Sequence, residues 1–247
     1  LVTIQDIAFK TRAMSAPTLI LTAFKDGVIL EDSLSGAKGC AFVSMLDLVS
    51  LPDHFVDRER ERDILESVLE AGVGIVIVSG IKGIGKTSLV RITMERFKGR
   101  KNIFWYAAHD WDTARSFMEQ VSDMYVRLGR NELKKALRQT KDVDVSQAAA
   151  ALARDMKDSD SVLVVDNVFD LGKEMMQIIH LLCEQAGSMH KSCLVLITRD
   201  REQLVCATSG TMTKKTEITI GGLDRNSAME MMRSEEHTSE LQSRQVI

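Results

Sequence analysis

A glycine-rich segment carries the strongest chemical pattern in this sequence. Gly80, Gly83 and Gly85 precede Lys86 and Thr87 at the spacing G-x-x-x-x-G-K-[ST]. Glycines let the backbone curl until several N–H groups point at one anion, and a following helix adds its positive end. Lys86 supplies a point charge suited to β- and γ-phosphates, and the Thr87 hydroxyl suits Mg²⁺. We predict a phosphate-binding loop made of Gly80, Ile81, Lys82, Gly83, Ile84, Gly85, Lys86 and Thr87.

Two other interpretations of this segment remain open. A glycine turn followed by an unrelated lysine would match the same sequence pattern, although such a match arises by chance with a probability on the order of 1%. A dinucleotide-binding loop fits poorly, because its glycines follow G-x-G-x-x-G. The flanking sequence favours the phosphate loop, since the β-branched run 74–79 precedes it and an amphipathic segment follows.

Polar residues follow two other apolar runs. Asp166 ends the run 162–165, and a carboxylate at the carboxyl end of a parallel strand can hold Mg²⁺ directly or through water. A simple turn role is the alternative. The next residue, Asn167, can orient a water but is a poor general base. Arg199 follows the run 194–197 and Thr198, where a cation can reach a γ-phosphate or merely lie on the surface.

The elements around these residues alternate between strands and helices. We predict strands at 74–79, 102–106, 162–165, 194–197 and 216–220. We predict helices from about 58, at 86–97, along the apolar stripe from Phe117 to Leu128, at 145–156, at 173–186 and at 224–232. This order predicts an α/β fold with three layers, in which helices cover both faces of a central, mostly parallel five-stranded sheet. Two short strands, 19–21 and 28–30, are expected before this domain.

The composition is that of an ordinary globular chain. Of 247 residues, 45% are apolar and 27% charged, and the net charge is −3. This charge predicts no binding to nucleic acid or to an anionic membrane, and the apolar runs are too short to cross a bilayer. Cys40, Cys183, Cys193 and Cys206 form no CxxC pair, so we expect a reducing, cytoplasmic compartment.

The two ends of the chain depart from this pattern. The sequence begins with Leu1, and residues 233–243 resemble the translation of a sequencing-library adapter. We therefore expect a poorly defined segment 1–50, a nucleotide-binding domain 51–232 and an artefactual tail 233–247. On this hypothesis the natural chain continues differently after Met232.

Taken together, the motifs resemble the NB-ARC group of STAND ATPases, which are nucleotide switches in signal transduction. The resemblance covers 51–232 and rests on segments 51–59 (similar to F-V-G-R-E), 78–88 (the Walker A loop), 102–106, 162–168 (the Walker B strand) and 194–200. It implies ATP or ADP with Mg²⁺ as ligands. It places Val56 and Arg58 at the adenine, Asp166 at Mg²⁺ and Arg199 at the γ-phosphate. The residues it places around the phosphates are Gly83, Gly85, Lys86, Thr87 and Ser88.

Two departures from the family bear on function. Asp57 replaces a glycine of the opening motif, and Asn167 stands where many relatives have a second acid. The resemblance thus implies an ATP/ADP switch with slow or absent hydrolysis, in a full-length protein that binds protein partners or self-assembles. The alternatives are a conventional turning-over ATPase of the AAA+ type, a small-molecule kinase, or a scaffold that no longer binds nucleotide.

Overall fold

The structure is a computed structural model. It describes residues 23–25, 28–30, 42–46, 55, 57–72, 74–139, 144–168, 171–200, 215–223, 225 and 227–229. The chain divides into two compact units, 1–41 and 42–247. In the first unit, β1 (Ala23–Lys25) pairs antiparallel with β2 (Val28–Leu30). The strand predicted at 28–30 is therefore confirmed, whereas the one predicted at 19–21 lies outside the described residues.

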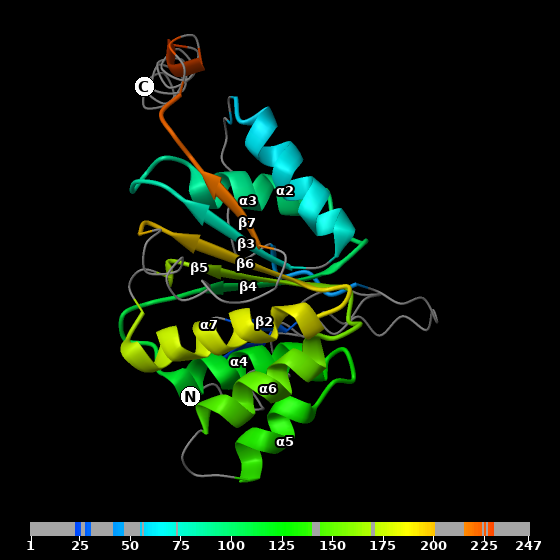
Figure 1. The fold of residues 1–247 in the computed structure, drawn as a ribbon. Helices are drawn as coiled ribbons and strands as arrows, with labels where there is room; N and C mark the ends of the chain where they lie inside the picture. Colours follow the sequence, from blue (N-terminus) through cyan, green and yellow to red (C-terminus); the bar gives the residue numbers. More distant parts are fainter. Residues whose placement is uncertain are drawn as a thin grey trace, which may run out of the picture. The chain divides into compact units, whose positions relative to one another are not determined.

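The larger unit is built on a parallel sheet of five strands in the order β4-β5-β6-β3-β7. Their arrowheads point to the same side in Figure 1. The strands are β3 (Gly74–Ser79), β4 (Asn102–Ala107), β5 (Ser161–Asp166), β6 (Cys193–Thr198) and β7 (Lys215–Thr219). Each overlaps a predicted strand, and the predicted α/β fold with a central five-stranded sheet is confirmed. All four pairings in this sheet are parallel.

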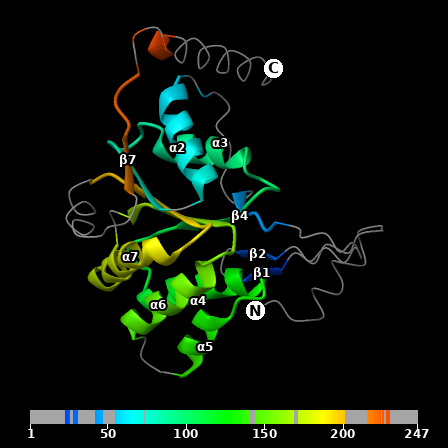
Figure 2. The same cartoon turned by 45° about the vertical axis from the view of Figure 1, so that its right-hand side comes forward.

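Helices cover both faces of this sheet, as Figures 1 and 2 show from two directions. One face carries α2 (Glu59–Ala71) and α3 (Lys86–Glu95). The opposite face carries α4 (Ala114–Val126), α6 (Val145–Met156) and α7 (Lys173–Gln185), with the short 3₁₀ helix η3 (Ala186–Ser188) after α7. A further helix, α5 (Glu132–Gln139), lies outside that second layer. Among the described residues, no helix is both long and apolar enough to cross a membrane.

Two helix predictions need correction. The stripe from Phe117 to Leu128 is not one helix to its end, because α4 ends at Val126 and Gly129 takes a left-handed φ of 73°. The helix α5 was not predicted, since its apolar side is only Leu133 and Leu137 among charged residues. Its first two N–H groups, of Glu132 and Leu133, bond to the buried carboxylate of a residue on α6, Asp155, at 3.0 and 2.8 Å. Of the predicted helix 224–232, only 225 and 227–229 are described, and they are helical.

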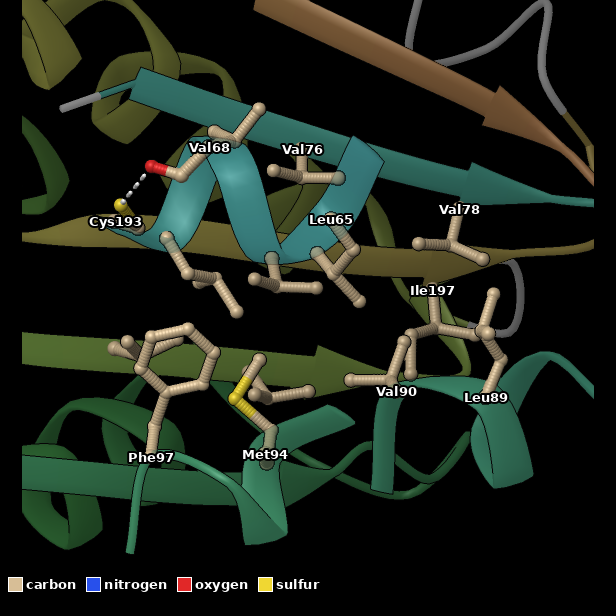
Figure 3. Close-up of a cluster of buried hydrophobic side chains, with 14 of the residues drawn as sticks. Leu65, Val68, Val76, Val78, Leu89, Val90, Met94, Phe97, Cys193 and Ile197 are labelled. Atoms are coloured by element: carbon tan, nitrogen blue, oxygen red, sulfur yellow. Dashed lines mark hydrogen bonds between the residues drawn. The ribbon is translucent and has the colours of Figure 1, made fainter. Parts of the chain in front are cut away.

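Side chains alternate between the two faces of the sheet. Figure 3 shows Val76 and Val78 of β3 packing with Leu65 and Val68 of α2 and with apolar side chains of α3. On the other face, the ring of Phe104 meets that of Tyr125 edge-on at 4.9 Å, which fixes α4 against β4. The central strands β3, β5 and β6 are apolar in their interiors, as expected where both faces of a sheet are covered.

Residues 42–46 extend the sheet beyond β4. The Met45 N–H donates to Ile103 O at 3.0 Å, and the Ile103 N–H donates to Val43 O at 2.8 Å. The Asn102 amide accepts from the Val43 N–H at 2.9 Å and so ties the segment to the edge strand. The larger unit thus begins at Phe42, before the Leu51 boundary suggested by the sequence motifs.

Candidate nucleotide site

The carboxyl ends of four strands meet at one edge of the sheet. Ser79 of β3 is paired with Thr198 of β6 on one side and with Thr219 of β7 on the other. Val165 of β5 is paired with Leu196 of β6. The residues that follow these positions, which include the glycine-rich loop, Asp166 and Arg199, are therefore brought to the same edge.

The glycine-rich loop forms an open bend between β3 and α3. Gly83 and Gly85 have φ values of 80° and 96°, and Gly85 is the N-cap of α3. Space is open where a Cβ would stand at either residue, so their backbone is exposed to a ligand. Gly80 has another role, since a Cβ there would lie 2.8 Å from the carbonyl oxygen of Ile220, after β7. The segment after β7 therefore packs directly on the start of the loop.

Lys86 is anchored inside this bend. Its ammonium donates to the carbonyl oxygens of Gly80 and Ile81, both at 2.8 Å. An ammonium has three protons, so one remains for a phosphate oxygen. Burial lowers the pKa of Lys86, the positive charge of Arg199 lowers it further, and the charge of Asp166 acts in the opposite direction. This pattern places Arg199 and Asp166 within electrostatic range of Lys86.

Thr87 and Asp166 form the second part of the site. The Thr87 hydroxyl donates to Asp166 Oδ2 at 2.9 Å, and Asp166 Oδ1 accepts from the Asn167 N–H at 2.8 Å. Burial raises the pKa of Asp166, although both hydrogen bonds and Lys86 oppose the shift. A hydroxyl and a carboxylate next to the glycine-rich loop are oxygen ligands of the kind that Mg²⁺ takes alongside phosphate oxygens and waters.

The remaining predicted residues of the phosphate side differ in their exposure. Asn167 is exposed and takes a left-handed φ of 61°, which asparagine tolerates better than most residues. Arg199 is exposed directly after β6, and Ser88 is partly buried in the first turn of α3. In the loop itself, Ile81 and Lys82 are exposed, while Ile84 packs on the apolar core.

The residues predicted to border adenine are described only in part. Val56 lies outside the described residues. Arg58 is buried, caps the start of α2, and donates to Gly221 O after β7 at 2.6 Å. Asp57 and Arg58 both have left-handed φ values, of 66° and 79°, so the glycine position that Asp57 fills does require an unusual backbone. The Asp57 carboxylate accepts from the Arg58 N–H at 2.8 Å, which stabilises the turn locally.

The sequence interpretation missed the segment after β7 as part of this region. Ile220 contacts the start of the loop, and Gly221 accepts the Arg58 hydrogen bond. The signal was the pair Gly221-Gly222 directly after a predicted strand, because glycines at a strand end allow close approach of another backbone.

A glycine-rich loop joins a buried parallel strand to a helix, with an anchored lysine and a facing threonine–aspartate pair. These features define a P-loop nucleotide-binding domain. The chain belongs to the family of ATPase domains found predominantly in Archaea, which matches residues 55–245. The match thus includes most of the segment 233–247, and the artefactual origin of that segment stays a prediction.

Solved structures show the same fold. The Walker-type ATPase PABY2304 of Pyrococcus abyssi superposes with a TM-score of 0.55 at 14% identity, over 79% of this chain and 63% of that one. The ORC1 protein of Aeropyrum pernix, solved in complex with DNA, superposes with a TM-score of 0.54 at 16% identity, over 75% and 51%. This chain therefore spans less than two thirds of either structure. A search of the curated proteins finds no match.

Proposed function

We propose that this domain is an adenine-nucleotide switch of the STAND type that hydrolyses ATP slowly. One observation carries the proposal: the residue after Asp166, at the end of the strand that faces Thr87, is an asparagine rather than a second acid. A carboxamide cannot take a proton from an attacking water as a carboxylate can. Bound nucleotide then persists long enough to select between two conformations of the protein.

The contacts of the loop support the way in which the nucleotide would be held. The phosphates would lie against the N–H groups of Gly83 to Ser88, with the remaining proton of Lys86 on an oxygen. Thr87 and Asp166 would hold Mg²⁺, which neutralises phosphate charge when bound. Arg199 would contact the γ-phosphate, since it directly follows β6, whose end is paired with the end of β3 where the loop begins. The adenine would lie toward Arg58, where α2 begins and the guanidinium bonds to Gly221 O after β7.

The runner-up is a conventional ATPase of the AAA+ type, and turnover separates the two. Isothermal titration calorimetry with Mg-ADP should show binding, and Mg-ADP should raise the melting temperature because only the folded state binds it. Steady-state phosphate release should stay well below about 1 s⁻¹. Faster turnover would favour the conventional ATPase, and no binding of adenine nucleotide would contradict the switch and favour the scaffold.

We also propose protein partners, or self-assembly of the full-length protein, rather than nucleic acid. The net charge of −3 supports this choice. The Aeropyrum pernix ORC1 structure contains DNA, but a likeness at 16% identity concerns the fold. Fluorescence anisotropy with a labelled duplex at about 0.05 and 0.2 M salt tests the choice, because backbone binding weakens steeply with salt. Salt-sensitive binding of the duplex by the nucleotide-loaded protein would overturn it.

A further inference from the structure

An exposed aromatic pair lies in the loop 108–113, between β4 and α4. The rings of His109 and Trp111 stack with centroids 4.6 Å apart and planes 18° apart. Trp111 is 74% exposed, whereas Trp105 in the preceding strand is 4% exposed. Because the Trp111 indole is so exposed, the free energy of burying its large apolar surface is not gained in this chain, and aromatic residues are enriched where proteins bind partners.

The loop holds this pair in a defined geometry. Asp112 Oδ2 accepts from the Tyr106 hydroxyl at 2.7 Å and from the His109 N–H at 2.9 Å. Thr113 then caps α4 through reciprocal hydrogen bonds with Ser116. A surface that is already ordered loses little conformational entropy when a partner binds.

The loop is also hydrogen-bonded to the end of β5, where Asp166 is proposed to hold Mg²⁺. Ala107 at the end of β4 is paired with Asp166, and the Ala108 N–H donates to the Asp166 carbonyl oxygen at 2.9 Å. The two rings therefore come one and three residues after Ala108, whose N–H is bonded to the backbone of the residue proposed to hold Mg²⁺. A partner bound there would lie beside the phosphate end of the nucleotide site.

The charges of the loop indicate the chemistry of that partner. Asp110 is exposed next to Trp111, and Asp112 adds a second carboxylate within the same turn. The next cation along the chain, Arg115, is paired with Glu119 at 2.8 Å. The face of an indole attracts a cation, and the carboxylates strengthen that attraction while they repel phosphate.

We propose that Asp110 and Trp111 form a docking site for an arginine-bearing segment of a partner protein. The guanidinium would stack on the exposed indole face while Asp110 pairs with its charge. This inference does not depend on slow hydrolysis, and it adds an interaction surface to the nucleotide site.

Tryptophan fluorescence of the full chain tests the proposal, with the Trp111→Phe variant used to subtract the signal of Trp105. The probe is an octapeptide of alternating arginine and glycine. Its matched control carries citrulline, which has the shape of arginine without the charge. We expect saturable quenching of Trp111 by the arginine peptide and none by the citrulline peptide.

Charge variants make the test specific. Asp110→Asn should lower the affinity for the arginine peptide by about fivefold. Asp63→Asn, which removes the same charge from an exposed position on α2, should leave its affinity unchanged. The proposal would be overturned if both peptides quenched equally, or if Asp110→Asn bound the arginine peptide as tightly as the wild type does. Preferential quenching by a thymidine oligonucleotide would also overturn it, in favour of nucleic acid.

Discussion

Thr87 and Asp166 meet through a hydrogen bond of 2.9 Å, although 79 positions separate them in the chain. The bond joins the first turn of α3 to the carboxyl end of β5, and β3, the strand before α3, is separated from β5 by β6 in the sheet. It brings a hydroxyl and a carboxylate together at the edge where the glycine-rich loop opens. These are the two side chains that we propose as ligands of Mg²⁺.

Loss of the loop lysine should remove most nucleotide affinity. We expect Lys86→Ala to weaken Mg-ADP binding by about 100-fold, because a charge-assisted contact of ~3 kcal/mol is lost while the backbone bend remains. Calorimetry measures the change. Lys157→Ala, at an exposed position after α6, is the matched control and should bind normally. Retained affinity in Lys86→Ala would contradict the assignment of the loop.

Neutralising the Asp166 carboxylate should raise the stability of the fold near pH 7 but weaken the binding of Mg-ADP. Burial raises the pKa of Asp166 in the folded protein above its value in the unfolded chain. The protonated carboxyl therefore stabilises the fold at pH values below the unfolded-state pKa, and this stabilisation is lost as the pH rises through the folded-state pKa. We therefore expect Asp166→Asn to raise the free energy of unfolding near pH 7 without nucleotide, with a smaller gain near pH 4. Urea denaturation at both pH values measures this.

The same variant should bind Mg-ADP less tightly and respond less to removal of Mg²⁺ with EDTA. Asp63→Asn should show neither effect. A variant that is less stable than the wild type at pH 7 would mean that the ionised Asp166 carboxylate is a net stabilising group.

Restoring a second acid should speed hydrolysis if water activation limits the rate. Asn167→Asp is expected to raise turnover by about 100-fold, the lower range for general base catalysis. Aspartate tolerates the left-handed φ of 61° as asparagine does, so the backbone should not change. Asn167→Gly accepts the same φ without a carboxylate and should give no increase. An unchanged rate in Asn167→Asp would indicate that closure or product release is limiting.

Two glycines of the loop should respond differently to a methyl group. Gly80→Ala places a Cβ 2.8 Å from the Ile220 carbonyl oxygen, so β7 must shift, and we expect a loss of ~3 kcal/mol. Gly83→Ala meets open space and should lose ~1 kcal/mol from its φ of 80° alone. Chemical denaturation without nucleotide compares them, and equal losses would show that Ile220 does not constrain the loop.

Local patterns in the sequence were enough to predict much of the molecule. The apolar runs that become β3, β5 and β6 are buried on both faces, so they stand out from their surroundings. The glycine-rich loop is formed by residues that are adjacent in the chain, so the spacing of its glycines was enough to predict the bend that the structure contains. The strand-end positions of Asp166 and Arg199 were predicted for the same reason.

Other features depend on contacts that no local pattern reveals. The helix α5 is stabilised by Asp155 of α6, which lies far along the chain from the N–H groups it caps. The pairing of residues 42–46 with β4 likewise joins distant segments, and its signal in sequence is weak.

By itself, the sequence predicted the glycine-rich loop and determined the α/β layering, because both follow from residue types at short spacing. Only the tertiary structure decided which strand ends lie together, that Arg58 bonds to Gly221, and that the loop of Trp111 is hydrogen-bonded at Ala108 to the Asp166 backbone. The physical reason is that strand order is settled by packing of whole faces, and a short segment of sequence contains no record of its neighbours in the sheet.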